Sequence, residues 1–114
     1  LNDVESFQRT FSHIVDPSEN SDWHNIIMLE GVLIYLDEGV PSKLLSLCSS
    51  HLKGKELSGS LVFADLFRGL PSYEINDARD RFESDGWELL ESSWCVKPGL
   101  ARHMGVARVP KAVR

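Results

Sequence analysis

The sequence predicts an α/β fold, in which helices cover an open, mostly parallel sheet that ends in an antiparallel strand. Segments with apolar residues at three- and four-residue steps alternate with short apolar runs along the chain. That alternation is typical of parallel strands joined by helices. The last two apolar runs are joined by a short loop that contains a Lys-Pro-Gly turn, and a connection that short joins antiparallel neighbours.

One domain accounts for the whole chain, residues 1–114. Its 114 residues can form one core, and 42% apolar and 25% charged residues are ordinary values for a globular protein. The first residue is leucine, so we expect the chain to begin inside a longer reading frame or a processed product.

Three segments are predicted to be helices. Residues 3–14 carry a regular apolar stripe after a capping box that begins at Asn2. A second helix begins near Pro41, which suits a first helical turn, and ends at Gly54. The third runs from about residue 75 to an Asp-Gly stop.

Four apolar runs are predicted to be strands. The first reads as a buried strand, and the last as an antiparallel edge strand reached through a hairpin-like loop. In chain order the strands cover residues 25–29, 61–64, 87–94 and 103–109.

Glu30 is the strongest candidate for a binding residue, because a carboxylate directly after a buried strand must be paired or must face a ligand. In open α/β sheets, ligands bind beyond the carboxyl ends of the strands. Gly31 beside it would let a ligand approach closely. The alternative is that Glu30 caps residues 32–36.

Two further side chains are placed near the same rim. A helical turn after Gly31 would bring the Tyr35 ring back over the rim, although Tyr35 could equally be a core aromatic residue. Asp65 follows the second strand as Glu30 follows the first. Helix capping or a partner such as Arg68 would explain Asp65 as well as a ligand would.

Charge and hydropathy exclude some partners. The net charge of −5 argues against nucleic acid, although residues 97–114 carry five bases and no acid. We interpret that end as a solvated basic segment, the alternative being an arm that contacts an anion or RNA. No apolar run approaches the roughly 20 residues of a membrane span, and no signal peptide is visible. We therefore expect a soluble, cytoplasmic protein with no membrane contact, an organelle being the alternative.

Several kinds of catalytic site lack support. Cys48 and Cys95 form no disulfide framework and read as small buried hydrophobic residues. No G-x-S-x-G elbow is present, and no glycine-rich strand-to-helix turn could cradle a nucleotide-type cofactor. No metal site is expected, because the histidines fall in four segments without ligand spacing: His13, His24, His51 and His103.

Two stretches carry a family resemblance. Residues 28–36, MLEGVLIYL, resemble the AEGVLxYL signature of the leucine carboxyl methyltransferase-like family of class I S-adenosylmethionine-dependent methyltransferases. Residues 97–104, KPGLARHM, are similar to the ending of some members. Together the two stretches anchor a resemblance over most of residues 23–109.

The resemblance implies a Rossmann-like sheet of seven strands whose final strand is inserted antiparallel. This chain would be the C-terminal half of that sheet, a single partial domain without the N-terminal cofactor-binding half. It implies that Glu30, with Gly31 beside it, contacts the methionine part of S-adenosylmethionine, and that Tyr35 lies near the methyl donor or substrate. The basic stretch with Arg102 and His103 either orients the substrate or simply turns the chain into its last strand.

The expected function is transfer of a methyl group from S-adenosylmethionine to a carboxylate or hydroxyl oxygen of a small-molecule or other carboxylate-bearing acceptor. Such a displacement depends mainly on positioning, so no acid-base pair is required, and no catalytic residue is assigned. Cofactor binding requires that the missing half be supplied, and without it the chain would be an inactive fragment. The alternative is a non-catalytic α/β module that associates through an exposed sheet edge and an uncovered apolar face.

Overall fold

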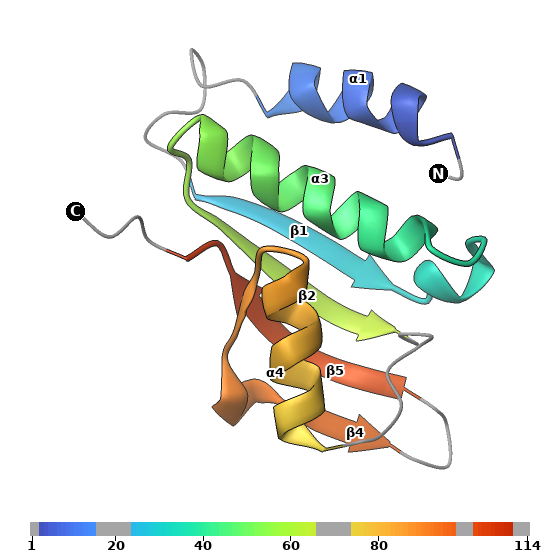
Figure 1. The fold of residues 1–114 in the computed structure, drawn as a ribbon, viewed down its shortest axis with the longest axis vertical. Helices are drawn as coiled ribbons and strands as arrows, with labels where there is room; N and C mark the ends of the chain where they lie inside the picture. The colour runs from blue at the N-terminus through green and yellow to red at the C-terminus, as the bar shows by residue number, and fades with distance from the viewer. Residues whose placement is uncertain (1–2, 16–23, 66–73, 98–101, 111–114) are drawn as a thin grey trace.

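The computed structural model of the chain describes residues 3–15, 24–65, 74–97 and 102–110. In this part, α-helices and a mixed sheet of five strands form an α/β fold, as predicted (Figure 1). The α-helices are α1 (Val4–Ile14), α3 (Val40–Gly54) and α4 (Ile75–Ser84), and two 3-10 helices are η1 (Leu33–Tyr35) and η2 (Glu91–Ser93). The strands are β1 (Asn25–Glu30), β2 (Gly59–Asp65), β3 (Glu88–Leu89), β4 (Cys95–Lys97) and β5 (Arg102–Arg108).

The last strand, β5, lies inside the sheet. β1 pairs with β2 in parallel, and β5 pairs antiparallel with the other side of β2. β3 and β4 both pair antiparallel with the outer side of β5. Strands β1 to β4 therefore share one direction and β5 opposes them, which confirms the predicted direction. The predicted edge position is wrong, because β5 returns between β2 and β4 and so pairs its backbone groups on both sides.

The predicted strand over residues 87–94 is broken in the structure. Only Glu88 and Leu89 pair with β5 there, and η2 follows before the chain pairs with β5 again in β4. The Ser93 hydroxyl accepts a hydrogen bond of 2.9 Å from the amide of Val106, a β5 residue. At this break, the Ser93 hydroxyl therefore takes the place of the backbone carbonyl that a neighbouring strand would offer to the Val106 amide.

The three α-helices lie close to their predicted ranges. The N-cap of α1 is Asp3, whose carboxylate accepts a hydrogen bond of 3.1 Å from the amide of Ser6. This corrects the predicted capping box at Asn2, which itself lies outside the described residues. Pro41 lies in the first turn of α3, and α3 ends at Gly54, as predicted.

Helices α3 and α4 cover the same face of the sheet. The ring of Phe82 on α4 stacks on Phe63 of β2, with a centroid distance of 4.9 Å. Leu52 of α3 lies against Gly59, which is four residues before Phe63 on β2 and therefore faces the same side of the sheet. α1 packs against α3 at the β1 end of the sheet (Figure 1). The core therefore lies between this face and the helices.

We call the opposite sheet face the open face. Its side chains are exposed or half-buried, and most of them are apolar. The strand register places Met28, Val62 and Val106 in one row across this face, and Glu30, Ala64 and Met104 in the next. A sheet of this kind normally buries an apolar face against another layer.

Strand β1 is not the buried strand that was predicted. It forms an edge of the described sheet, and its side chains alternate between half-buried and exposed. Ile26 is 64% exposed and Met28 is 70% exposed. The run of apolar residues suggested burial on both faces, but only the face toward α3 is packed.

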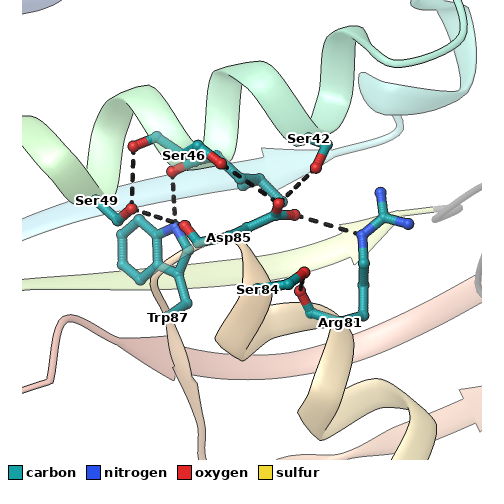
Figure 2. A network of polar contacts seen from close by, with 8 residues as sticks. Ser42, Ser46, Ser49, Arg81, Ser84, Asp85 and Trp87 are labelled. Carbon is teal, nitrogen blue, oxygen red and sulfur yellow. Dashed lines mark hydrogen bonds and ion pairs between the residues drawn. The ribbon is translucent and has the colours of Figure 1, made fainter.

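A buried polar network joins α3 to the turn after α4 (Figure 2). Asp85 is buried, and its carboxylate accepts hydrogen bonds from the hydroxyls of Ser42 and Ser46. Arg81 pairs with the same carboxylate at 3.4 Å. The Ser49 hydroxyl donates to the backbone carbonyl of Asp85 at 2.7 Å. Because each buried polar group has partners, the network holds the two helices in register.

The chain leaves this network through Gly86 and Trp87. Gly86 has a φ of +87°, a left-handed conformation that favours glycine. The Trp87 indole is fully buried, and its Nε1 donates a hydrogen bond of 2.9 Å to the carbonyl of Leu45 on α3 (Figure 2).

The two cysteines differ in environment, whereas both were predicted to be buried. Cys48 lies in the core beneath α3, where burial raises the pKa of its thiol to about 12. Cys95 is exposed at the start of β4. The prediction for Cys95 is wrong because β4 lies at the outer edge of the sheet.

Candidate functional site

The candidate site is the rim formed by the carboxyl ends of β1 and β2. Asp65 ends β2 and is only 1% exposed. Its Oδ2 accepts hydrogen bonds of 2.8 Å from the amide of Val32 and 2.9 Å from the amide of Leu33. Two amides at the start of η1 are thereby satisfied, as a capping side chain does at a helix start. This confirms that Asp65 has a capping role, while Arg68, the other partner considered for it, lies outside the described residues.

Glu30 ends β1 and is exposed. Because side chains alternate along a strand, Glu30 points to the open face, like Ile26 and Met28. The rim turn is capped by Asp65, so the alternative role of Glu30 as the cap of this turn has no support among the described contacts. An exposed carboxylate retains its hydration, so the desolvation argument that singled out Glu30 does not apply to it.

Gly31 carries the chain from β1 into the rim turn. It has a φ of +62°, and its amide donates a hydrogen bond of 3.2 Å to the carbonyl of Ala64. A Cβ built on Gly31 would meet no described atom within 4 Å. The turn thus requires glycine for its backbone conformation, and the space in front of it is open to a ligand.

Tyr35 lies in η1 and is 81% exposed. The core interpretation of this ring is therefore wrong, because η1 turns Leu33 and Leu36 inward and Tyr35 outward. An exposed tyrosine ring beside the rim is available to a bound molecule.

His103 lies on the other side of the sheet from Glu30. It pairs in register with Asp65 and is 2% exposed, on the face covered by the helices. Its ring stacks on Trp94, with centroids 5.5 Å apart and planes 24° apart. Burial lowers the pKa of His103 below its ordinary value, and a hydrogen bond with the backbone of Asp65 opposes that shift. The imidazole is therefore neutral at pH 7.

The structure brings the predicted site residues together only in part. Glu30, Gly31 and Tyr35 belong to one continuous rim segment, which Asp65 holds in place. Arg102 opens β5 opposite Lys97, and His103 is buried below the rim. Sequence reasoning considered capping for Asp65 but did not identify the turn after β1 as the capped segment, because Val32 lies 33 positions away in the chain.

Other kinds of site are not apparent in the described ranges. Among the residues that the structure describes, no group of three or more His, Cys, Asp or Glu side chains is placed to hold a metal ion. Within those same residues, no helix is long and apolar enough to cross a membrane.

Comparison with known proteins does not add a family. The chain matches no family model, no curated protein and no solved structure.

Proposed function

We propose that this chain is the C-terminal half of a class I S-adenosylmethionine-dependent methyltransferase, with a Rossmann-like sheet, that methylates a carboxylate or hydroxyl oxygen. The observation that carries the proposal is the strand order β1-β2-β5 followed by β3 and β4, with β5 alone reversed. The resemblance of residues 28–36 and 97–104 implies this inserted final strand.

The geometry of the rim supports a place for the cofactor. In open α/β sheets, ligands bind outside the carboxyl ends of the parallel strands, where Glu30 and Gly31 follow β1. The Glu30 carboxylate is exposed and can accept hydrogen bonds from the ammonium group of the methionine part of the cofactor. The open space at Gly31 permits close approach of the ligand to the backbone.

The acceptor would lie near Tyr35, whose exposed ring adjoins the same rim. His103 is not exposed to contact a substrate, because its side chain is buried beside Asp65 and stacks on Trp94. We infer that His103 supports the rim from below. Methyl transfer by in-line displacement then depends on how the rim positions the two reactants.

The test uses the longer reading frame that contains residues 1–114, so that the cofactor-binding half is supplied. Calorimetry would measure S-adenosylmethionine binding by the native protein and by Glu30→Ala. We expect the variant to bind about tenfold or more weakly, because a hydrogen bond to a charged group is lost. Glu38→Ala is the matched control, since Glu38 is also an exposed acid, eight positions along the chain, and should bind normally.

The outcomes separate two claims. Undiminished affinity in Glu30→Ala would remove Glu30 from the site but leave the methyltransferase proposal intact. Absence of cofactor binding by the native, longer protein would overturn the proposal itself.

A second candidate function is a non-catalytic module that acts by association. It is favoured by the exposure of Ile26 and Met28 beside the half-buried Val62 and Val106 on the open face, since exposed contiguous apolar surface marks interaction sites. Analytical ultracentrifugation of the 114-residue chain would test it. A stable monomer that binds no partner strand or protein would count against this function.

A further inference from the structure

We infer that the groove between α1 and the outer edge of β1 is a docking site for an extended apolar peptide segment outside residues 1–114, which adds a strand to the sheet beside β1. The groove does not depend on cofactor binding. If the methyltransferase proposal holds, the same groove is where the cofactor-binding half would join.

The floor of the groove is an apolar cavity of about 260 Å³. Its lining includes Phe7 of α1 and Ile27 and Leu29 of β1. Residues of α3, Cys48 among them, and Trp87 complete it. Contacts elsewhere hold α1 above this space. His51 on α3 lies within hydrogen-bond distance, 2.9 Å, of the Val15 carbonyl, and its ring packs edge-on against Phe11.

The wall of the groove is a hydrogen-bonding edge. The amides of Asn25 and Gly31 donate toward β2, at 3.1 Å to Ser58 and 3.2 Å to Ala64. Amides alternate in direction along a strand, so those of Ile26, Met28 and Glu30 point away from β2. No strand among the described residues pairs with that outer side. An edge of this kind is a template for another strand.

These two features define the chemistry of the occupant. A lipid or small apolar molecule could fill the cavity but could not satisfy a row of amides and carbonyls, whereas an added strand does both. One face of that strand would point into the cavity, and the other would lie beside Ile26 and Met28 on the open face. The occupant should therefore be apolar at nearly every position, as strands buried on both faces are.

A second copy of this chain is a poorer occupant. If β1 paired with β1 of another copy about a two-fold axis normal to the sheet, the helices of both copies would lie on the same side. Because Phe7 places α1 over the space beside β1, the two α1 helices would compete for it. A segment without a helix at that position fits the groove better.

The probe is a capped peptide of consecutive valines with a lysine at each end, added to the 114-residue chain. We expect it to slow hydrogen exchange at the amides of Ile26, Met28 and Glu30, measured by NMR. The amides of Asn25 and Gly31 should change little, because they are already hydrogen-bonded. The fluorescence of Trp87, which lines the cavity, should shift on binding.

Two controls remove the edge without removing the apolar surface. Met28→Pro deletes one outward amide, and proline is tolerated where a strand amide faces solvent. A peptide with N-methyl groups on alternate residues deletes the donors of the ligand and needs no protein variant. Each should weaken binding by about tenfold or more, while Met28→Leu should bind as the native chain does.

Other results would overturn the inference. Equal binding of the N-methylated peptide would show apolar capture without strand addition. Failure of the unmodified peptide to protect the three outward amides would refute the groove as a docking site. That result would not bear on cofactor binding by the longer protein, which the calorimetric assay tests separately. Concentration-dependent protection of those amides without peptide would identify a second copy as the occupant instead.

Discussion

The carboxylate of Asp65 accepts a hydrogen bond of 2.8 Å from the amide of Val32, 33 positions earlier in the chain. Through this bond, the end of β2 fixes the turn that follows the end of β1. The Leu33 amide shares the same oxygen at 2.9 Å. The start of η1, directly after Gly31, is therefore held by one buried side chain.

Asp65→Ala should destabilise the fold by about 2 to 3 kcal/mol, because it leaves two amides without their charged acceptor. Asp65→Asn should cost less, since its amide oxygen can still accept. Glu30→Ala is the matched control, an acid at the end of the neighbouring strand that is exposed, and should change stability by less than about 0.5 kcal/mol. Urea unfolding measures all three. Equal losses in Asp65→Ala and Glu30→Ala would contradict this account of the rim.

Gly86→Ala should destabilise the chain by about 2 kcal/mol or more. The φ of +87° is unfavourable for alanine, and the added Cβ would collide with the side chain of Ser49. Ser49→Ala should partly relieve the collision, so the double variant should lose less than the sum of the two single losses. Gly54→Ala, at a helix end where a Cβ meets nothing within 4 Å, should be close to neutral. Thermal unfolding of the four variants measures these losses. Additive losses in the two single variants and the double variant would contradict a collision between residue 86 and Ser49.

Stability should fall as the pH drops below the ordinary histidine pKa of 6.5. Burial lowers the pKa of His103 in the folded chain, so the unfolded chain binds more protons between the lowered pKa and 6.5. Linkage then makes the free energy of unfolding rise with pH across that window. Urea unfolding at pH 7.5 and pH 5.5 should show a smaller pH effect in His103→Phe than in the native chain. An identical pH effect in both would assign it to other groups.

Thiol labelling should distinguish the two cysteines. Cys48 is buried and its pKa is raised to about 12, so almost no thiolate is present at pH 8. Cys95 is exposed and should react with an aromatic disulfide reagent in the folded state. We expect one thiol per native chain to react promptly, none in Cys95→Ser, and both native thiols after denaturation. Prompt labelling of Cys95→Ser would show that α3 opens readily.

Local patterns predicted the helices well and the neighbours of each strand poorly. The stripe and the proline and glycine signals of α3 are properties of contiguous residues, so its limits followed from the sequence. The hairpin from β4 into β5 is equally local, but a hairpin does not specify which side of β4 receives the new strand. The insertion beside β2 depends on distant pairing. Only the family resemblance implied it.

The rim shows the same division. Glu30 and Asp65 both follow apolar strands in the sequence, and nothing local distinguishes the exposed acid from the buried one. The difference arises because Glu30 points to the open face, whereas Asp65 points to the face that the helices cover. The apolar run of β1 likewise reads as buried, although Met28 is 70% exposed. Which acid is desolvated depends on which face of the sheet the helices cover, and neither strand shows this locally.

The interior position of β5 also sets the order in which the sheet can form. β5 is the last described strand, yet it separates β2 from β3 and β4. During synthesis the parallel β1-β2 pair can form early, but β3 and β4 have no partner until β5 has emerged. A chain shortened before β5 would lose the middle of its sheet and not its margin, leaving two unpaired strand edges exposed at once. Such intermediates are prone to aggregate.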